Sequence, residues 1–338
     1  MKLKKTLALI LGAALSVASL TGCSQTTMNY ADELAKTEKW EATSSEVSGK
    51  VSINAQGINE DINFTSTGYA TGDKAYAKVD FTTTDTTLNL KIPSIEMYID
   101  NGVSYINKSY YEGLYSNNGL EVPKKLKELN ADYIAVDSGI DVAAMKSLTS
   151  EPETMNTLIK SIFGDSDIDL PYIQNGREYT MNLNSNDAVD LGVKGIKAAA
   201  DNLENINSTF KLNLTADNIA SFKTFVKDQA FNNGIAAVKE AVAGSTISSK
   251  EVFTDDKYTM DLGLNLVVKD FGNISVDMTG SSSKSEVKEI AMPTNFVKLT
   301  EEQLQSIISE GNEEQITSQT AYSKESLNLK HIIAKTAA

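Results

Sequence analysis

Apolar and polar residues alternate in the first third of the chain, and this alternation predicts antiparallel β-strands. Val47, Gly49, Val51, Ile53 and Ala55 alternate with polar residues, as in a strand with one face in water. Further strands are predicted at 62–70, 75–83, 87–92 and 95–105. The sequence DNG at 100–102 interrupts the last of these and predicts a hairpin turn, because Asn and Gly tolerate positive φ angles.

A second alternating block lies near the C-terminal end and is more strongly apolar. Large apolar side chains occupy every second position of one segment: Tyr258, Met260, Leu262, Leu264, Leu266 and Val268. At about 3.3 Å per residue, such a strand spans about 33 Å, which implies a broad sheet. Ile274, Val276 and Met278 continue the alternation, and a final strand is predicted at 286–291, before Pro293.

The middle of the chain has helical spacing instead. Helices are predicted within 121–129, 141–148, 151–163, 186–203 and 215–242, with strands between them at 133–136, 178–184 and 210–214. This order of strands, then helices, then strands favours the α+β class, with one large antiparallel sheet and helices over one of its faces. A wide sheet twists, and one that also curls without closing is a half-barrel with a concave apolar face.

The two ends of the chain complete the predicted domain organisation. A short helix is predicted at 29–42, where Trp40 is expected to pin it to the sheet. Thr300 and Gln303 form a capping box that predicts a terminal helix of about ten residues. We therefore expect a signal peptide at 1–22, a tether and helix at 23–45, a single half-barrel-like domain at 46–310 and a flexible tail at 311–338.

The first 22 residues are typical of a secretory signal. Lys2, Lys4 and Lys5 precede the apolar run 6–20, whose 15 residues are fewer than the roughly 20 that span a bilayer. The sequence LTGC at 20–23 resembles the bacterial lipobox, which implies cleavage before Cys23 and diacylglycerol on its sulfur. The alternative is an ordinary signal peptide with an incidental cysteine. Two acyl chains hold firmly, so the resemblance implies a palmitate-type anchor on the extracytoplasmic face of the cell membrane.

Charge and cysteine content narrow the classes of partner. Loss of the signal lysines takes the formal charge from −14 to −17, and the sequence pI is about 4.7. This acidity opposes binding to nucleic acid, which needs clustered Lys or Arg. Cys23 is the one cysteine, so its lipidation would leave no thiol for a disulfide, a nucleophile or a thiolate metal site.

Several features together resemble the LolA/LppX type of half-barrel lipoproteins and lipid carriers. These are the lipobox, the N-terminal helix, the long strands, MYIDNGVSYIN at 97–107, the central helices and EIAMPTNFVKL at 289–299. The resemblance is one of pattern and order over most of 29–310, and the long helical insert is a departure from it. It implies a hydrophobic cavity that shields acyl chains, with no catalytic residue.

Candidate catalytic and metal-binding residues are sparse. His331 is the sole histidine and lies in the predicted tail, so a Ser/His/Asp triad or an imidazole metal site lacks its key member. Asp165, Asp167 and Asp169 alternate as in a calcium loop, but an EF-hand needs Gly at the sixth position and Glu at the twelfth. Leu170 and Gly176 stand there, which favours a solvated loop. We predict no enzyme activity, cofactor or metal.

The sequence therefore predicts a binder or carrier of a lipid or other hydrophobic ligand, with its oligomeric state left open. The residues predicted to line the ligand share one strand face: Met260, Leu262, Leu264, Leu266, Ile274, Val276 and Met278. The alternative is a module with a fully packed core that binds glycan, peptide or protein on its surface. That alternative draws on a cluster of aromatic rings, which packing explains equally well: Tyr105, Tyr110, Tyr111 and Tyr115.

Overall fold

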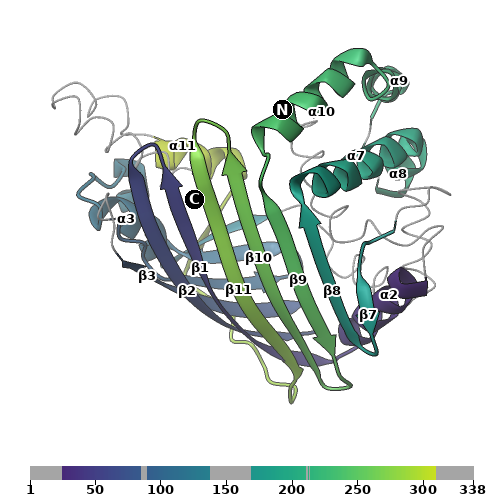
Figure 1. Cartoon of the computed structure of the whole chain (residues 1–338). Coiled ribbons are helices and arrows are strands. Elements are labelled where there is room, and N and C mark those ends of the chain that lie inside the picture. The colour runs from purple at the N-terminus through teal and green to yellow at the C-terminus, as the bar shows by residue number, and fades with distance from the viewer. Residues whose placement is uncertain (1–24, 85–89, 138–168, 211, 213, 310–338) are drawn as a thin grey trace. The chain divides into compact units, whose positions relative to one another are not determined.

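The computed structural model describes residues 25–84, 90–137, 169–210, 212 and 214–309 (Figure 1). In these residues the chain is an α+β protein with eight helices and one open, mostly antiparallel sheet of 12 strands. The strands lie in the order β12-β6-β5-β4-β3-β2-β1-β11-β10-β9-β8-β7. The predicted class and the predominance of antiparallel strands are confirmed.

The long strands belong to the two alternating blocks, and the shorter ones connect to the helices. The strands are β1 (Ala42–Ala55), β2 (Ile58–Thr71), β3 (Lys74–Thr84), β4 (Ile95–Asp100), β5 (Val103–Asn107), β6 (Tyr133–Asp137), β7 (Ile173–Asn175), β8 (Glu178–Asn184), β9 (Thr246–Phe253), β10 (Lys257–Val268), β11 (Gly272–Lys284) and β12 (Phe296–Leu299). The helices are α2 (Gln25–Glu38), α3 (Lys108–Ser116), α4 (Lys124–Glu128), α7 (Ser185–Asp201), α8 (Leu203–Phe210), α9 (Ala216–Phe225), α10 (Gln229–Ala241) and α11 (Glu301–Ser309).

The chain divides into two compact units. Unit 1 comprises Met1–Trp40 and Lys146–Ile274, and unit 2 comprises Glu41–Met145 and Ser275–Ala338. Unit 1 contains α2, α7 to α10 and β7 to β10, whereas unit 2 contains β1 to β6, β12, nearly all of β11, and α3, α4 and α11.

In unit 2 a meander from β1 to β6 places apolar residues opposite one another. Phe64 of β2 lies opposite Gly49 of β1 and Phe81 of β3. The predicted turn between β4 and β5 is confirmed, with positive φ at Asn101 and Gly102. Strand β12 pairs with β6 in the parallel direction, which is possible because the chain returns to the sheet edge after β11.

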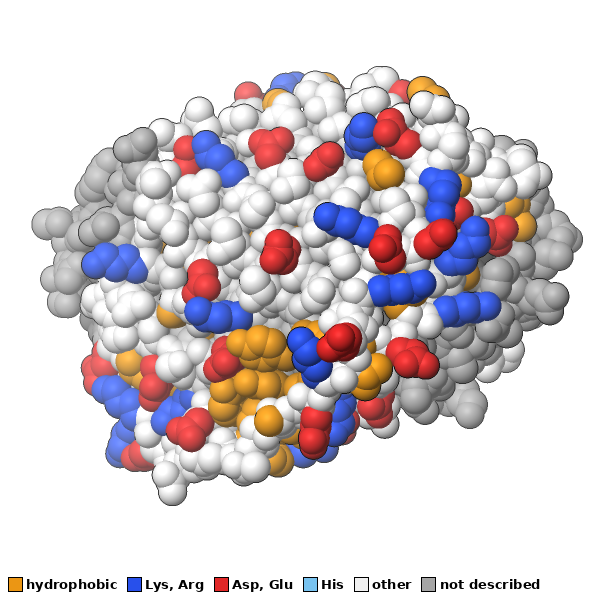
Figure 2. All heavy atoms as spheres, turned by 90° about the horizontal axis from the view of Figure 1, so that it is seen from below, with side chains coloured by type: hydrophobic (Ala, Val, Ile, Leu, Met, Phe, Trp, Pro, Cys, Tyr) orange, Lys and Arg blue, Asp and Glu red, His pale blue; other side chains and the backbone are white. Residues whose placement is uncertain are grey.

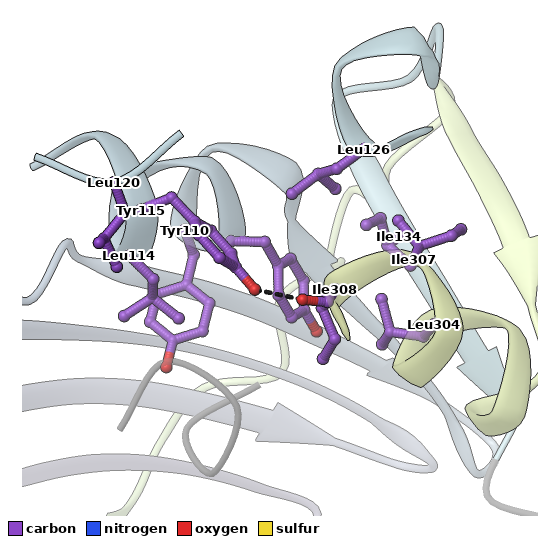
Figure 3. Close-up of a cluster of buried hydrophobic side chains, with 10 residues drawn as sticks. Tyr110, Leu114, Tyr115, Leu120, Leu126, Ile134, Leu304, Ile307 and Ile308 are labelled. Atoms are coloured by element: carbon purple, nitrogen blue, oxygen red, sulfur yellow. Dashed lines mark hydrogen bonds between the residues drawn. The ribbon is translucent and has the colours of Figure 1, made fainter. Parts of the chain in front are cut away.

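The buried core of unit 2 lies where α3, α4 and α11 cover the face of β4, β5, β6 and β12 (Figure 3). Leu126, Ile134 and Ile308 are fully buried there. The hydroxyl of Tyr115 donates a hydrogen bond to the carbonyl oxygen of Ile308, so α3 and α11 are joined. The capping box of α11 is confirmed, since Thr300 and Gln303 exchange side-chain to backbone hydrogen bonds of 2.8 and 3.1 Å.

In unit 1 the antiparallel strands β7 to β10 have helices at both ends (Figure 1). Helix α2 packs near the end of β9 at Phe253, to which Tyr30 makes an edge-to-face contact of 5.8 Å between ring centroids. Helix α7 begins directly after β8, and the side chain of Asn184 caps it by accepting from the backbone N–H of Asp187 at 3.0 Å.

Some of the predicted elements are wrong in place or kind. The first helix ends at Glu38 and not at Ala42, because Ala42 is the first residue of β1. Trp40 is buried, as expected. Positions 286–291 form no strand, and neither do 90–92. Of the strand predicted at 210–214, position 210 ends α8 and positions 212 and 214 form no strand. Residues 87–89, 211 and 213 and the helices predicted at 141–148 and 151–163 lie outside the described residues. The predicted domain boundaries stay predictions.

Candidate functional site

The apolar face predicted on β10 exists in unit 1 and is only half-buried. Met260, Leu262, Leu264 and Leu266 are all partly accessible to solvent. Because directly paired residues share a sheet face, Leu264 has Ile247 of β9 beside it. None of the four reaches the full burial that large apolar side chains have in a closed core, and most residues on the opposite face of β10 are buried to the same intermediate degree.

The remaining predicted lining residues lie on β11 and are also half-buried. Ile274 belongs to unit 1, whereas Val276 and Met278 belong to unit 2. A side chain at Gly280 would meet Cγ2 of Val47 at 3.5 Å. Since Gly280 shares a face with Val276 and Met278, those two residues lie on the Val47 face of β1.

That face continues across unit 2, and we call its part on β1, β2, β3 and β11 the open half. It carries apolar side chains that are half-buried throughout: Val47, Val51, Ile62, Phe64, Val79, Phe81, Val276 and Met278. Phe64 lies across β1, because a Cβ atom at Gly49 would come within 2.6 Å of its Cζ. A glycine there lets the ring lie close to the neighbouring backbone.

The part of the same face on β4, β5, β6 and β12 is the covered half. Ile95, Ile106 and Val297 pack against the buried cluster from α3, α4 and α11. Register links the two halves, because Val79 of β3 lies opposite Ile95 of β4. One continuous apolar face is therefore covered by helices at one end and partly exposed at the other.

In unit 1 a buried carboxylate lies at one end of the β10 face. Glu251 is 4% exposed and accepts hydrogen bonds from the hydroxyls of Tyr30, Tyr172 and Tyr258 at 2.8, 2.6 and 2.7 Å. It lies opposite Met260. Three donors satisfy most of the acceptor capacity of a carboxylate, so Glu251 is held in place beside the predicted lining residues.

The electrostatics of this cluster make it structural at neutral pH. Burial, together with the charge of Glu251, raises the pKa of Tyr30, Tyr172 and Tyr258 well above the ordinary tyrosine value. The three phenols therefore keep their protons at neutral pH and donate them in hydrogen bonds to Glu251. The arrangement fastens α2 to the sheet.

The opposite face of the unit 2 sheet carries a stripe of aromatic rings, which we call the outer stripe: Tyr76, Tyr98, Tyr105, Tyr133 and Phe296. The carboxylate of Glu96 accepts from the hydroxyls of Tyr76 and Tyr133 at 3.2 and 2.7 Å. Phe296 is 42% exposed and meets Tyr105 edge to face at 5.0 Å. Figure 2 views the molecule from below and shows hydrophobic side chains gathered in a patch among charged ones.

The other candidate residues separate in space. Tyr110, Tyr111 and Tyr115 are buried in the unit 2 core, whereas Tyr105 lies on the outer stripe, so the structure does not bring the predicted tyrosine cluster together. Asp169 accepts from the Thr27 hydroxyl at 3.3 Å. The residues Cys23, Asp165, Asp167 and His331 lie outside the described part of the chain.

Other surface features bear less directly on a ligand. A shallow hollow of about 350 Å³ is lined by residues of β12 and α11, including Leu299, Gln303 and Ile307. Within the described residues, no group of three or more His, Cys, Asp or Glu side chains could hold a metal ion. No helix in that part of the chain is long and apolar enough to cross a membrane.

Comparison of the sequence with protein-family models and with curated proteins finds no match.

Proposed function

We propose that this chain is a non-enzymatic lipoprotein of the cell envelope that binds or carries a lipid or other hydrophobic ligand. Lipid on Cys23 anchors it to the extracytoplasmic face of the membrane, and a half-barrel with helices over its concave face holds the ligand. The observation that carries the proposal is the half-buried apolar face of β10 in unit 1 and of the open half in unit 2. Sites for hydrophobic ligands are lined mainly by apolar side chains of this kind.

The free energy gained by burying apolar groups sets how long an acyl chain must be to bind. Burying a methylene group contributes about 0.8 kcal/mol, so a chain of about 14 methylenes gains roughly 11 kcal/mol before costs. Association costs at least about 4 kcal/mol in lost translational and rotational freedom. A six-carbon chain gains roughly that amount and should not bind measurably, whereas a sixteen-carbon chain should.

The ligand is tested with the soluble chain from Ser24 onward, which keeps every described residue. Native mass spectrometry should find co-purified lipid, and a fluorescent sixteen-carbon fatty acid should bind. Leu264→Arg places a charge on the apolar face of β10 and should abolish binding, whereas Asn265→Arg places the same charge on the opposite face of the same strand and should leave binding intact. A folded Leu264→Arg variant that binds as well as the parent chain would sink the proposal.

The anchor is tested separately in cells. Cys23→Ser should release the protein from the membrane fraction or leave its signal uncleaved, because the two acyl chains would be absent. If the variant stays processed and membrane-bound, another anchor holds the protein.

The outer stripe favours a second function, binding of a glycan or peptide. Half-exposed aromatic rings beside a carboxylate provide stacking surfaces and a hydrogen-bond acceptor, and Tyr76, Tyr98 and Glu96 supply both. Tyr98→Ala should abolish binding of such a ligand without changing fatty acid binding. Fatty acid binding that falls with Tyr98→Ala and survives Leu264→Arg would move the lipid site to the stripe.

A further inference from the structure

Helix α2 is fastened to the sheet of unit 1 along its length. The amide of Asn29 donates to the side-chain oxygen of Gln174 at 2.9 Å, and the Tyr30 hydroxyl reaches the buried Glu251. One turn further on, Arg177 donates through Nε to Glu33 at 3.1 Å. Thr27 in the first turn is fully buried. The helix is therefore a rigid part of unit 1 and cannot act as a flexible spacer.

The lipid-bearing residue of the proposed function is very close to this helix in the sequence. Only Ser24 separates Cys23 from Gln25, the first residue of α2. Two residue steps of about 3.8 Å limit the distance between the Cα atoms of Cys23 and Gln25 to roughly 7 Å. A thioether bound to diacylglycerol lies at the bilayer surface, so the first turn of α2 must lie at that surface too.

The same end of unit 1 carries an apolar side chain that protrudes into solvent. Ile173, on the edge strand β7, is 71% exposed. Its neighbours Tyr172 and Gln174 both contact α2, through a ring contact of 4.5 Å with Tyr30 and the hydrogen bond from Asn29. The first turn of α2 itself has no acidic residue, and the carboxylate of Asp169 accepts a hydrogen bond from the hydroxyl of Thr27 in that turn.

We infer that the end of unit 1 formed by the first turn of α2 and by Ile173 of β7 is a membrane-contact surface, and that the bilayer itself is its partner. The inference rests on the lipid anchor of the proposed function. The anchored protein thus has a fixed orientation, with the Glu251 end of the β10 face directed toward the membrane.

A fluorescent label at Ile173 tests this orientation, because the anchored chain has no free thiol. Ile173→Cys and Val238→Cys each introduce one labelling site at an exposed apolar position of unit 1. Val238 lies on α10, which precedes β9, whereas Tyr30 contacts Phe253 at the other end of β9. Seven residue steps along this strand separate the ends by about 23 Å, and Figure 1 shows α10 and α2 at opposite ends of it.

Each labelled full-length protein is purified in its membrane-anchored form and reconstituted into phosphatidylcholine vesicles with nitroxide-labelled lipid near the headgroup. We expect several-fold greater quenching at position 173 than at position 238. A flexible insert of about 20 Gly and Ser residues between Ser24 and Gln25, with a root-mean-square span of roughly 25 Å, should remove most of the difference. Equal quenching at the two positions, or a difference that the insert leaves unchanged, would overturn the orientation.

The parent chain distinguishes failure of the anchor from failure of the orientation. If Cys23 carries no lipid, the parent protein reacts with the thiol label and stays out of the vesicles, which overturns the anchor and the orientation together. If the parent protein is unreactive and vesicle-bound while positions 173 and 238 are quenched equally, the anchor stands and the orientation alone is wrong.

Discussion

The covered half and the open half of unit 2 have the same kinds of strand residue on one sheet face, yet these side chains are buried to different extents. In the covered half Ile134 is fully buried. In the open half Ile62, on the same face, is half-buried. The difference comes from a second layer, since Leu126 of α4 and Ile308 of α11 pack over the first region. The comparison shows that strand alternation alone does not decide between core and binding surface.

The largest expected effect comes from truncating one isoleucine in each half. Ile134→Ala should lower the free energy of unfolding by about 3 kcal/mol, because it leaves a cavity in a packed core. Ile62→Ala should lower it by about 1 kcal/mol, because the side chain buries less surface. Urea denaturation monitored by circular dichroism measures both. Equal losses would mean that the open half is as tightly packed as the covered half.

An intermediate effect is expected at alkaline pH, and the covered half contributes to it through two buried tyrosines. Burial raises the pKa of Tyr110 and of Tyr115 to about 12. Between about pH 10 and 12 the unfolded chain loses these protons while the folded chain keeps them, so stability is intact below pH 10 and falls as the pH rises toward 12. Each ring contributes at most about 3 kcal/mol to this loss.

The control for the alkaline effect is the double variant Tyr110→Phe, Tyr115→Phe. Its free energy of unfolding, measured in urea at a series of alkaline pH values, should decline less steeply than that of the parent chain. Parallel declines would show that these two buried phenols carry no linkage.

The smallest expected change in the free energy of unfolding comes from removing a tyrosine hydroxyl, and two tyrosines of unit 2 should differ in it. Tyr115→Phe removes the hydrogen bond from α3 to the carbonyl oxygen of Ile308 and should cost about 1 kcal/mol, because a buried acceptor loses its donor. Tyr105→Phe removes a half-exposed hydroxyl on the outer stripe and should change stability by less than about 0.5 kcal/mol. A larger loss at Tyr105 than at Tyr115 in urea denaturation would contradict the assignment of the core.

The sequence predicted the strands well where local patterns decide the structure. The alternation around Val51 and Leu264 corresponds to β1 and β10, and the DNG turn and the α11 capping box are in place. Helix α3 escaped prediction because its Ser, Tyr and Gly residues have modest to low helix propensity. Its buried face carries Tyr111, Leu114 and Tyr115, which have helical spacing. That spacing is too short to identify a helix until the packing of this segment over β5 and β6 is known.

Features that depend on distant residues could not be predicted in this way. The parallel pairing of β12 with β6 joins segments about 160 residues apart, and no turn signal links them. The Glu251 cluster unites Tyr30, Tyr172 and Tyr258 from separate elements, so no spacing along the chain reveals it. The apolar face of β10 could be predicted because alternation of large apolar residues is a local pattern, but its half-burial depends on the packing of other elements. That its residues line a ligand stays a prediction.

The most direct test of the central claim is to map where a photoactivatable sixteen-carbon fatty acid reacts with the soluble chain from Ser24 onward. We expect adducts on peptides that carry β10 and the open half, including Leu264, Phe64 and Phe81, and we expect excess palmitate to remove them. The covered half should stay unlabelled, because α3, α4 and α11 occupy its surface. Adducts confined to the outer stripe, or none that palmitate displaces, would contradict the claim that the half-buried apolar face binds a hydrophobic ligand.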